Sequence, residues 1–114
     1  MPLEAKDQGL LLDLIKAAGE AQGFVVGMSE AAFLKDLRTQ KALEREFEIM
    51  GEAARTLSLA AREQFPQVPF RSMIGMRNIL GHDFGRVDPK ELWKTVQAAL
   101  PSLLKELKKA KKRY

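Results

Sequence analysis

The 114-residue sequence contains no cysteine and only one histidine, His82. The absence of thiols excludes disulfides, iron–sulfur clusters and thiolate zinc sites, and one imidazole is too few for a histidine-rich metal site within one chain. No apolar run approaches the roughly 20 residues of a membrane-spanning helix, and residues 1–7 lack the basic and then apolar pattern of a secretory signal. We therefore expect a cytoplasmic protein, away from membranes, that uses no cofactor and no tightly bound transition metal.

Charge is unevenly distributed along the chain. Of the total net charge of +4, residues 105–114 contribute six cations and one anion, Glu106, so the preceding residues carry a slight negative excess. We predict one helical domain over residues 1–104 and a basic tail over residues 105–114 that continues the last helix. The cations of the tail either favour the negative end of the helix dipole or contact an RNA backbone.

Apolar residues recur at helical spacing along most of the chain, and no segment shows the alternation of a strand. The predicted helices cover residues 4–22, about 29–37, roughly 39–65, 69–81 and 88 onward. Ser29 offers a side-chain cap for the short second helix, which Phe33, Leu34 and Leu37 are expected to anchor. Pro101 is expected to kink the last helix without ending it, because the apolar spacing continues beyond it.

The third predicted helix carries the clearest pattern. Its apolar residues form one continuous stripe at spacings of three and four, made of Leu43, Phe47, Met50, Ala54, Leu57 and Ala61. Such a stripe packs best against another long helix. On other faces, Glu44, Glu48 and Glu52 are expected to be solvated or to pair with Arg45 and Arg55. The predicted fold is an all-α, antiparallel bundle of four long helices and one short helix.

Two residues near the end of the fourth helix are candidates for catalysis. His82 follows Arg77 by five positions, beside Gly81. Imidazole, with a typical pKa of about 6.5, exchanges protons at neutral pH, and a guanidinium is shaped to bind phosphate. Together they suit phosphodiester cleavage, in which a base removes the proton of a ribose 2′-hydroxyl and a cation offsets the charge on the phosphate. A purely structural role for a lone histidine stays open at this point.

The spacing of Arg77, Asn78 and His82 resembles the motif of the HEPN superfamily, which consists of small helical bundles that include metal-independent ribonucleases. Further segments are similar, in order, to the HepT-like toxins of type VII toxin–antitoxin pairs. These segments are residues 42–45, 49–54, 65–70, 74–78, 82–85, 87–88 and 92–93. The resemblance extends from about residue 8 to residue 104.

The resemblance implies an HEPN-like homodimer in which two arginine–histidine motifs face a shared cleft and cut RNA without a metal. Arg77 would then bind and stabilise the phosphate, and His82 would be the general base or acid. Asn78 and Asp83 would orient these groups or contact RNA, and Glu52 would be an ion-pair partner of Arg77. The implied partners are RNA, a second copy of the chain, and a cognate, MntA-like nucleotidyltransferase antitoxin.

Phe84 departs from the family pattern. HepT-like toxins carry at this position a tyrosine to which the antitoxin attaches AMP, and Phe84 has no hydroxyl to accept it. Gly81 replaces a branched apolar residue and is a second departure. The sequence therefore leaves two interpretations open. One is a ribonuclease toxin that its antitoxin silences by binding alone, and the other is a non-catalytic HEPN module that binds a nucleotide or a nucleotidyltransferase.

Overall fold

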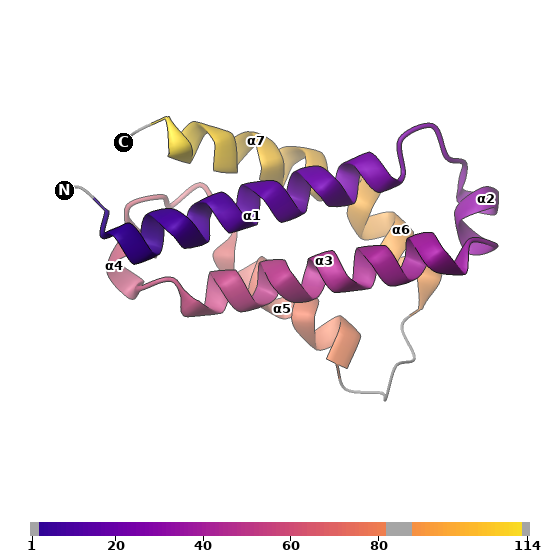
Figure 1. The fold of residues 1–114 in the computed structure, drawn as a ribbon, viewed down its shortest axis with the longest axis horizontal. Coiled ribbons are helices and arrows are strands. Elements are labelled where there is room, and N and C mark those ends of the chain that lie inside the picture. The colour runs from indigo at the N-terminus through magenta and orange to yellow at the C-terminus, as the bar shows by residue number, and fades with distance from the viewer. Residues whose placement is uncertain (1–2, 82–87, 113–114) are drawn as a thin grey trace.

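The computed structural model describes the backbone of residues 3–81 and 88–112, and their side chains except those of residues 76–81. This part of the chain is helical and contains no strand, which confirms the all-α prediction. Seven helices follow one another in the described ranges (Figure 1): α1 (Ala5–Phe24), α2 (Glu30–Leu34), α3 (Leu37–Thr56), α4 (Leu59–Glu63), α5 (Phe70–Gly81), α6 (Pro89–Ala98) and α7 (Leu100–Lys111). None of these helices is long and apolar enough to cross a membrane.

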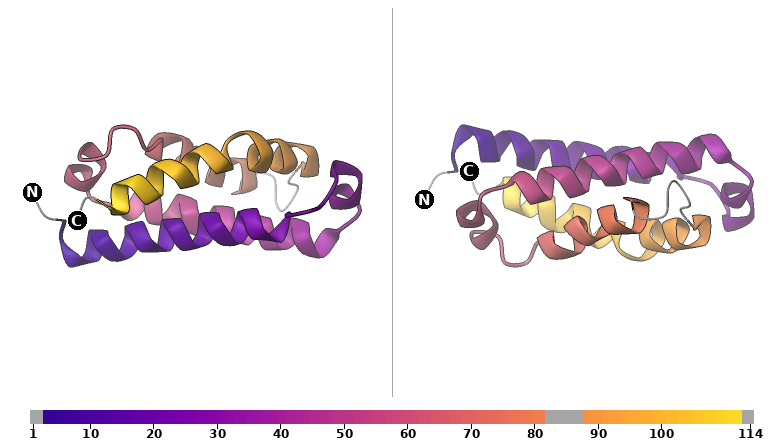
Figure 2. Two further views of the ribbon diagram at one scale, coloured as in Figure 1. Left: turned by 90° about the horizontal axis from the view of Figure 1, so that it is seen from above. Right: turned by 90° about the horizontal axis from the view of Figure 1, so that it is seen from below.

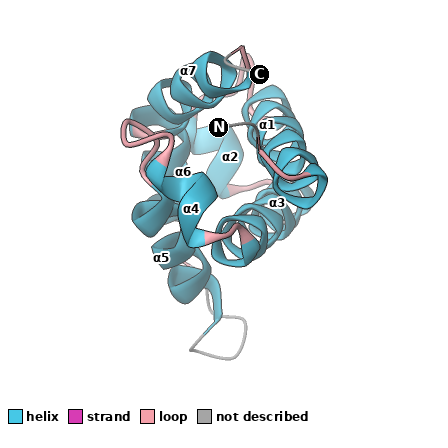
Figure 3. Ribbon diagram, turned by 90° about the vertical axis from the view of Figure 1, so that its left-hand side faces the viewer, coloured by secondary structure: helices cyan, strands magenta, loops and turns pink. Residues whose placement is uncertain are grey.

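The long helices run along one axis. Helices α1 and α3 lie side by side in opposite directions, and α1 begins at the same end of the bundle at which α7 ends (Figures 1 and 2). Seen from one end, α7, α1, α3 and α5 follow one another around the core (Figure 3). The short helix α2 packs against α3 and α6 at the other end of the bundle.

The predicted stripe begins on α3, continues through Leu57 to Ala61 on α4, and lies in the core of this arrangement. Every member of it is buried, with Leu43, Met50 and Ala54 fully inaccessible to solvent, so the predicted burial is confirmed. Helix α1 meets the stripe with Leu14 and with small buried residues such as Ala18. Small side chains allow the two helix backbones to approach each other closely, which lets the larger residues of α3 reach across the core.

Helix α3 ends at Thr56, so the prediction of one helix through residue 65 is wrong. Leu57 adopts an extended conformation with ψ of 141°, and Ser58 then caps α4 by accepting a hydrogen bond from the Ala61 amide. A residue far away in the sequence fixes this break. The buried carboxylate of Asp7 accepts hydrogen bonds from the Ser58 amide at 3.0 Å and from the Ser58 hydroxyl at 2.7 Å.

Replacement of Asp7 by alanine tests this connection between the start of α1 and the α3–α4 turn. The substitution removes both hydrogen bonds and leaves the Ser58 amide without its acceptor, which costs about 1–3 kcal/mol of unfolding free energy. Urea denaturation is the measurement, with the exposed Asp13→Ala as a matched control on the same helix. Equal midpoints for the two variants would contradict the proposed role of Asp7.

The second helix is shorter than expected and its anchor differs in part. Ser29 caps it as predicted, since its hydroxyl accepts from the Ala32 amide at 3.1 Å. Phe33 is fully buried and its ring lies 5.2 Å from that of Trp93 on α6. Leu37, in contrast, is 64% exposed and begins α3, so its predicted anchoring role is wrong. The buried Gln40 amide takes that role instead, donating to the Phe33 carbonyl at 2.9 Å.

The predicted last helix consists of two segments, α6 and α7, that meet at Ala99. Pro101 lacks an amide hydrogen, so the carbonyl four residues earlier loses its helical donor. The apolar spacing continues across the break, because Leu100, Leu103 and Leu107 are all buried. The buried face thus continues while the hydrogen-bond ladder is interrupted, and α6 and α7 meet at an angle (Figure 1).

Candidate functional site

Arg77 and Asn78 lie in α5, the helix that ends at Gly81. Their backbone is described, but their side chains are not. His82, Asp83 and Phe84 lie outside the described residues. Convergence of Arg77 and His82, and the roles of Asn78 and Asp83, therefore stay predictions.

The structure does define how α5 is held. Its first turns insert Phe70 and the fully inaccessible Met73 into the core, and the preceding segment adds the buried Phe65 and Val68. Helix α5 packs along α3, the helix that carries Glu52 (Figure 1). Position 77 thus lies on a helix whose first turns are anchored in the core, and such anchoring is a suitable support for a phosphate-binding arginine.

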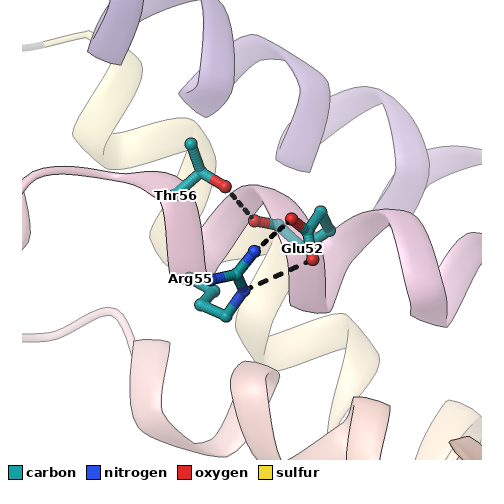
Figure 4. A network of polar contacts seen from close by, with 3 residues as sticks. All are labelled: Glu52, Arg55 and Thr56. Atoms are coloured by element: carbon teal, nitrogen blue, oxygen red, sulfur yellow. Dashed lines mark hydrogen bonds and ion pairs between the residues drawn. The ribbon is translucent and has the colours of Figure 1, made fainter.

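Glu52 takes part in a local network on the surface of α3. Two nitrogens of the Arg55 guanidinium donate to its carboxylate, Nε to Oε2 at 3.4 Å and the terminal Nη2 to Oε1. The Thr56 hydroxyl donates to the Glu52 carbonyl at 2.8 Å (Figure 4). The hydrogen bond and charge of Glu52 raise the pKa of Arg55. The predicted pairing of Glu52 with Arg55 is confirmed, whereas its pairing with Arg77 stays a prediction.

Neighbouring carboxylates on α3 follow the same pattern. Glu48 pairs with Arg45 at 3.3 Å, as predicted, and Glu44 pairs with Lys41 at 3.5 Å rather than with an arginine. Glu48 and Glu52 line a shallow groove of about 250 Å³ between α1 and α3. This surface is mixed in charge, which makes it a poor match for a polyanion.

Glu46 is a buried titratable residue that the sequence pattern did not single out. It is 5% exposed on the flank of the α3 stripe. Burial raises its pKa to about 7, and a hydrogen bond and the charge of Glu20 on α1 add to the shift, while Lys16 and Arg45 oppose it. Near neutral pH the carboxyl is therefore partly protonated and links α3 to α1. Its spacing from the buried stripe could have indicated this burial, because it lies three residues after Leu43 and four before Met50.

The raised pKa of Glu46 predicts how stability depends on pH. The folded state holds this proton up to about pH 7, whereas the unfolded glutamate releases it near pH 4.3. The contribution of Glu46 to stability is thus present below the unfolded pKa and declines as the pH rises towards the folded pKa. The difference in melting temperature between Glu46→Gln and the wild type should therefore be more favourable to the variant at pH 8 than at pH 5. The exposed Glu48→Gln serves as a control, and a difference that does not change with pH would contradict the assignment.

A sequence profile described as ribonuclease HepT-like matches residues 14–110. The chain therefore belongs to the HepT-like ribonuclease family, which confirms the resemblance inferred from its motifs. The match covers all seven helices at least in part and includes the positions of Arg77 and His82.

Named relatives agree with this family. A probable ribonuclease HepT of Thermococcus cleftensis is 35% identical over 102 residues, covering 90% of this chain and 93% of the relative. A Methanocaldococcus jannaschii protein named as a candidate RNase is 34% identical over 100 residues, covering 88% and 92%. Another candidate RNase, from Caldanaerobacter subterraneus subsp. tengcongensis, is 36% identical over 84 residues, covering 74% and 75%. No solved structure matches the chain.

Proposed function

We propose that this chain is a metal-independent endoribonuclease and the toxin of a toxin–antitoxin pair. The observation that carries the proposal is the family match over residues 14–110, which spans the arginine–histidine motif at Arg77 and His82. The packing of α5 against α3 is consistent with it, because the helix that carries Arg77 is anchored on the core of the bundle.

The proposed reaction is attack of a ribose 2′-hydroxyl on the adjacent phosphorus. His82 takes the hydroxyl proton as the new phosphorus–oxygen bond forms, and Arg77 offsets the negative charge that grows on the phosphate oxygens. The bond to the 5′-oxygen breaks, and that oxygen receives a proton from an acid. The products are a 2′,3′-cyclic phosphate and a 5′-hydroxyl, so this step consumes no water.

A homodimer completes such a site. One chain has a single histidine, yet the step uses both a base and an acid. A twofold axis that brings two motifs to one cleft provides a second His82 for the second role. Asn78 and Asp83 would orient these groups or hold the RNA strand at the same cleft.

Phe84 supports a specific form of control. Because its side chain has no hydroxyl, a nucleotidyltransferase antitoxin of the MntA-like kind has no AMP acceptor at this position. Silencing would then rest on binding alone. The same residue, together with Gly81, is the observation that favours the second candidate, a non-catalytic module that binds a nucleotide or a nucleotidyltransferase.

One cleavage assay distinguishes the two candidate functions. Purified protein is incubated with single-stranded RNA in the presence of EDTA and, separately, of Mg²⁺. A ribonuclease of the proposed kind cuts the RNA equally well under both conditions. RNA that stays intact under both conditions would favour the non-catalytic module, and cleavage only with Mg²⁺ would contradict the metal-independent mechanism.

A further inference from the structure

A groove runs along one side of the bundle, between the entry to α5 and helix α7. It consists of two adjoining hollows of about 350 and 370 Å³, and both are lined by Gln67 and Glu106. One wall is formed by residues 65–69 and the first turn of α5, and the other by the α6–α7 junction and α7. We call this feature the α7 groove.

The lining of the α7 groove combines apolar and polar groups. Met73 and Leu103 form buried apolar parts of its walls. Ser72 and Ser102 add a hydroxyl from each side, and Gln67 adds an amide with both donors and acceptors. Apolar walls with a few hydrogen-bonding groups suit a flat heterocycle with polar edges, such as an unpaired nucleobase.

A rim of exposed cations runs along α7, and one of its members, Lys109, lines the α7 groove. Lys105, Lys109 and Lys112 are all exposed, and they lie within about 60° of one another on an ideal helix, over a length of about 10 Å. Lys109 lines the groove itself and pairs with Glu106 at 3.5 Å. Glu106 is the acidic residue of the groove lining, so the rim and groove together keep a net positive charge.

Favourable interaction with the helix dipole does not account for the whole rim. That interaction acts mainly within the last turn of a helix. Lys105 lies six residues before the end of α7 at Lys111, beyond that turn. A row of cations that continues along the helix beside a groove matches the regularly spaced charges of a nucleic-acid strand.

We propose that the α7 groove binds a single-stranded segment of RNA, with bases in the groove and phosphates along Lys105, Lys109 and Lys112. This inference rests on the proposed ribonuclease function and names a second contact region for its substrate. Ser72 in the groove precedes Arg77 by five residues on α5, about 7.5 Å along the helix axis. A strand that leaves the groove along α5 therefore reaches the level of the predicted phosphate-binding arginine.

The test measures binding of a fluorescein-labelled single-stranded RNA of about 12 nucleotides. Its riboses carry 2′-O-methyl groups, which remove the nucleophile and keep the probe intact with wild-type protein. Fluorescence anisotropy gives the affinity over roughly 50–200 mM salt. The variant is Lys105→Gln/Lys109→Gln/Lys112→Gln. The control, Lys35→Gln/Arg38→Gln/Lys41→Gln, removes the same charge from exposed residues. Each variant also breaks one ion pair of 3.5 Å, Lys109–Glu106 in the groove variant and Lys41–Glu44 in the control.

The groove variant should bind about tenfold more weakly or worse, and the slope of log affinity against log salt should become shallower by about 2, since each phosphate contact on a single strand contributes about 0.7. Ser102→Leu, which fills the groove, should weaken binding and leave the slope unchanged. Equal affinity and slope for the groove variant and the control would overturn the inference. That result would leave the lysines as a surface for another partner, such as an acidic protein segment.

The binding and cleavage assays test the two proposals separately. If unmodified RNA is cut while the groove variant binds the probe like the control, the inference is wrong and the proposed function stands. If no RNA is cut while the groove variant loses affinity as described, the catalytic proposal is wrong and the α7 groove remains an RNA-binding surface.

Discussion

Replacement of His82 by alanine is expected to reduce RNA cleavage by about 10²–10⁴-fold, the range contributed by a general base or acid. The effect should be large because His82 is the only histidine of the chain, so the proposed homodimer would, in the variant, have neither the base nor the acid. Arg77→Ala should cause a loss of similar size, because it removes the cation that offsets the phosphate charge in the transition state. Initial rates of cleavage of a labelled RNA in EDTA are the measurement.

Arg38→Ala is the matched control for Arg77→Ala. Arg38 is an exposed cation near the start of α3, on a different helix from Arg77. Circular dichroism melts of all variants establish that the fold is kept. If either His82→Ala or Arg77→Ala retained wild-type rates in a folded protein, the assigned roles would be wrong.

Replacement of Phe33 by alanine is expected to cause the largest loss of stability. Phe33 is fully inaccessible to solvent, and its ring contacts that of Trp93 at a centroid distance of 5.2 Å. Truncation leaves a cavity where α2, α3 and α6 meet, and such changes typically cost about 3–5 kcal/mol. Urea unfolding measures the change, and Phe24→Ala, which truncates a phenylalanine that is 42% exposed, should cost much less.

The comparison of the two phenylalanine variants also tests how the end of the bundle is built. In the structure the buried ring of Phe33 and the Gln40 amide together hold α2 in place. If Phe33→Ala and Phe24→Ala lost equal amounts of unfolding free energy, α2 would contribute little to the core. The packing described here would then be wrong at this end.

The helical class and the α3 stripe follow from the sequence because they depend on local spacing. A residue every three or four positions reports directly on a buried helix face, and Leu43, Phe47 and Met50 are buried as their spacing predicts. The end of α3 does not follow from local spacing. Leu57 and Ala61 continue the stripe, yet the break between them is fixed by Asp7, which bonds to Ser58 from 51 positions away.

The burial of Glu46 is a second feature that local spacing alone does not predict. A glutamate near a stripe is usually assigned to the solvated face, and only the packing of α1 against α3 brings Glu20 to it and removes it from water. The candidate site, in contrast, is predicted mainly from the sequence. Arg77 and His82 stand out through their chemistry and their spacing, and the structure adds that the helix carrying Arg77 packs against α3. The α7 groove required the structure, because its walls come from segments at least 25 positions apart.

The most direct test of the central proposal is the chemistry of the cleaved ends. A short single-stranded RNA is incubated with the wild-type protein in EDTA, and the product termini are identified by mass spectrometry. The 2′-hydroxyl mechanism predicts a 2′,3′-cyclic phosphate on one fragment and a 5′-hydroxyl on the other, and neither product with the His82→Ala protein. Fragments with 3′-hydroxyl and 5′-phosphate ends, or cleavage that continues without His82, would contradict it.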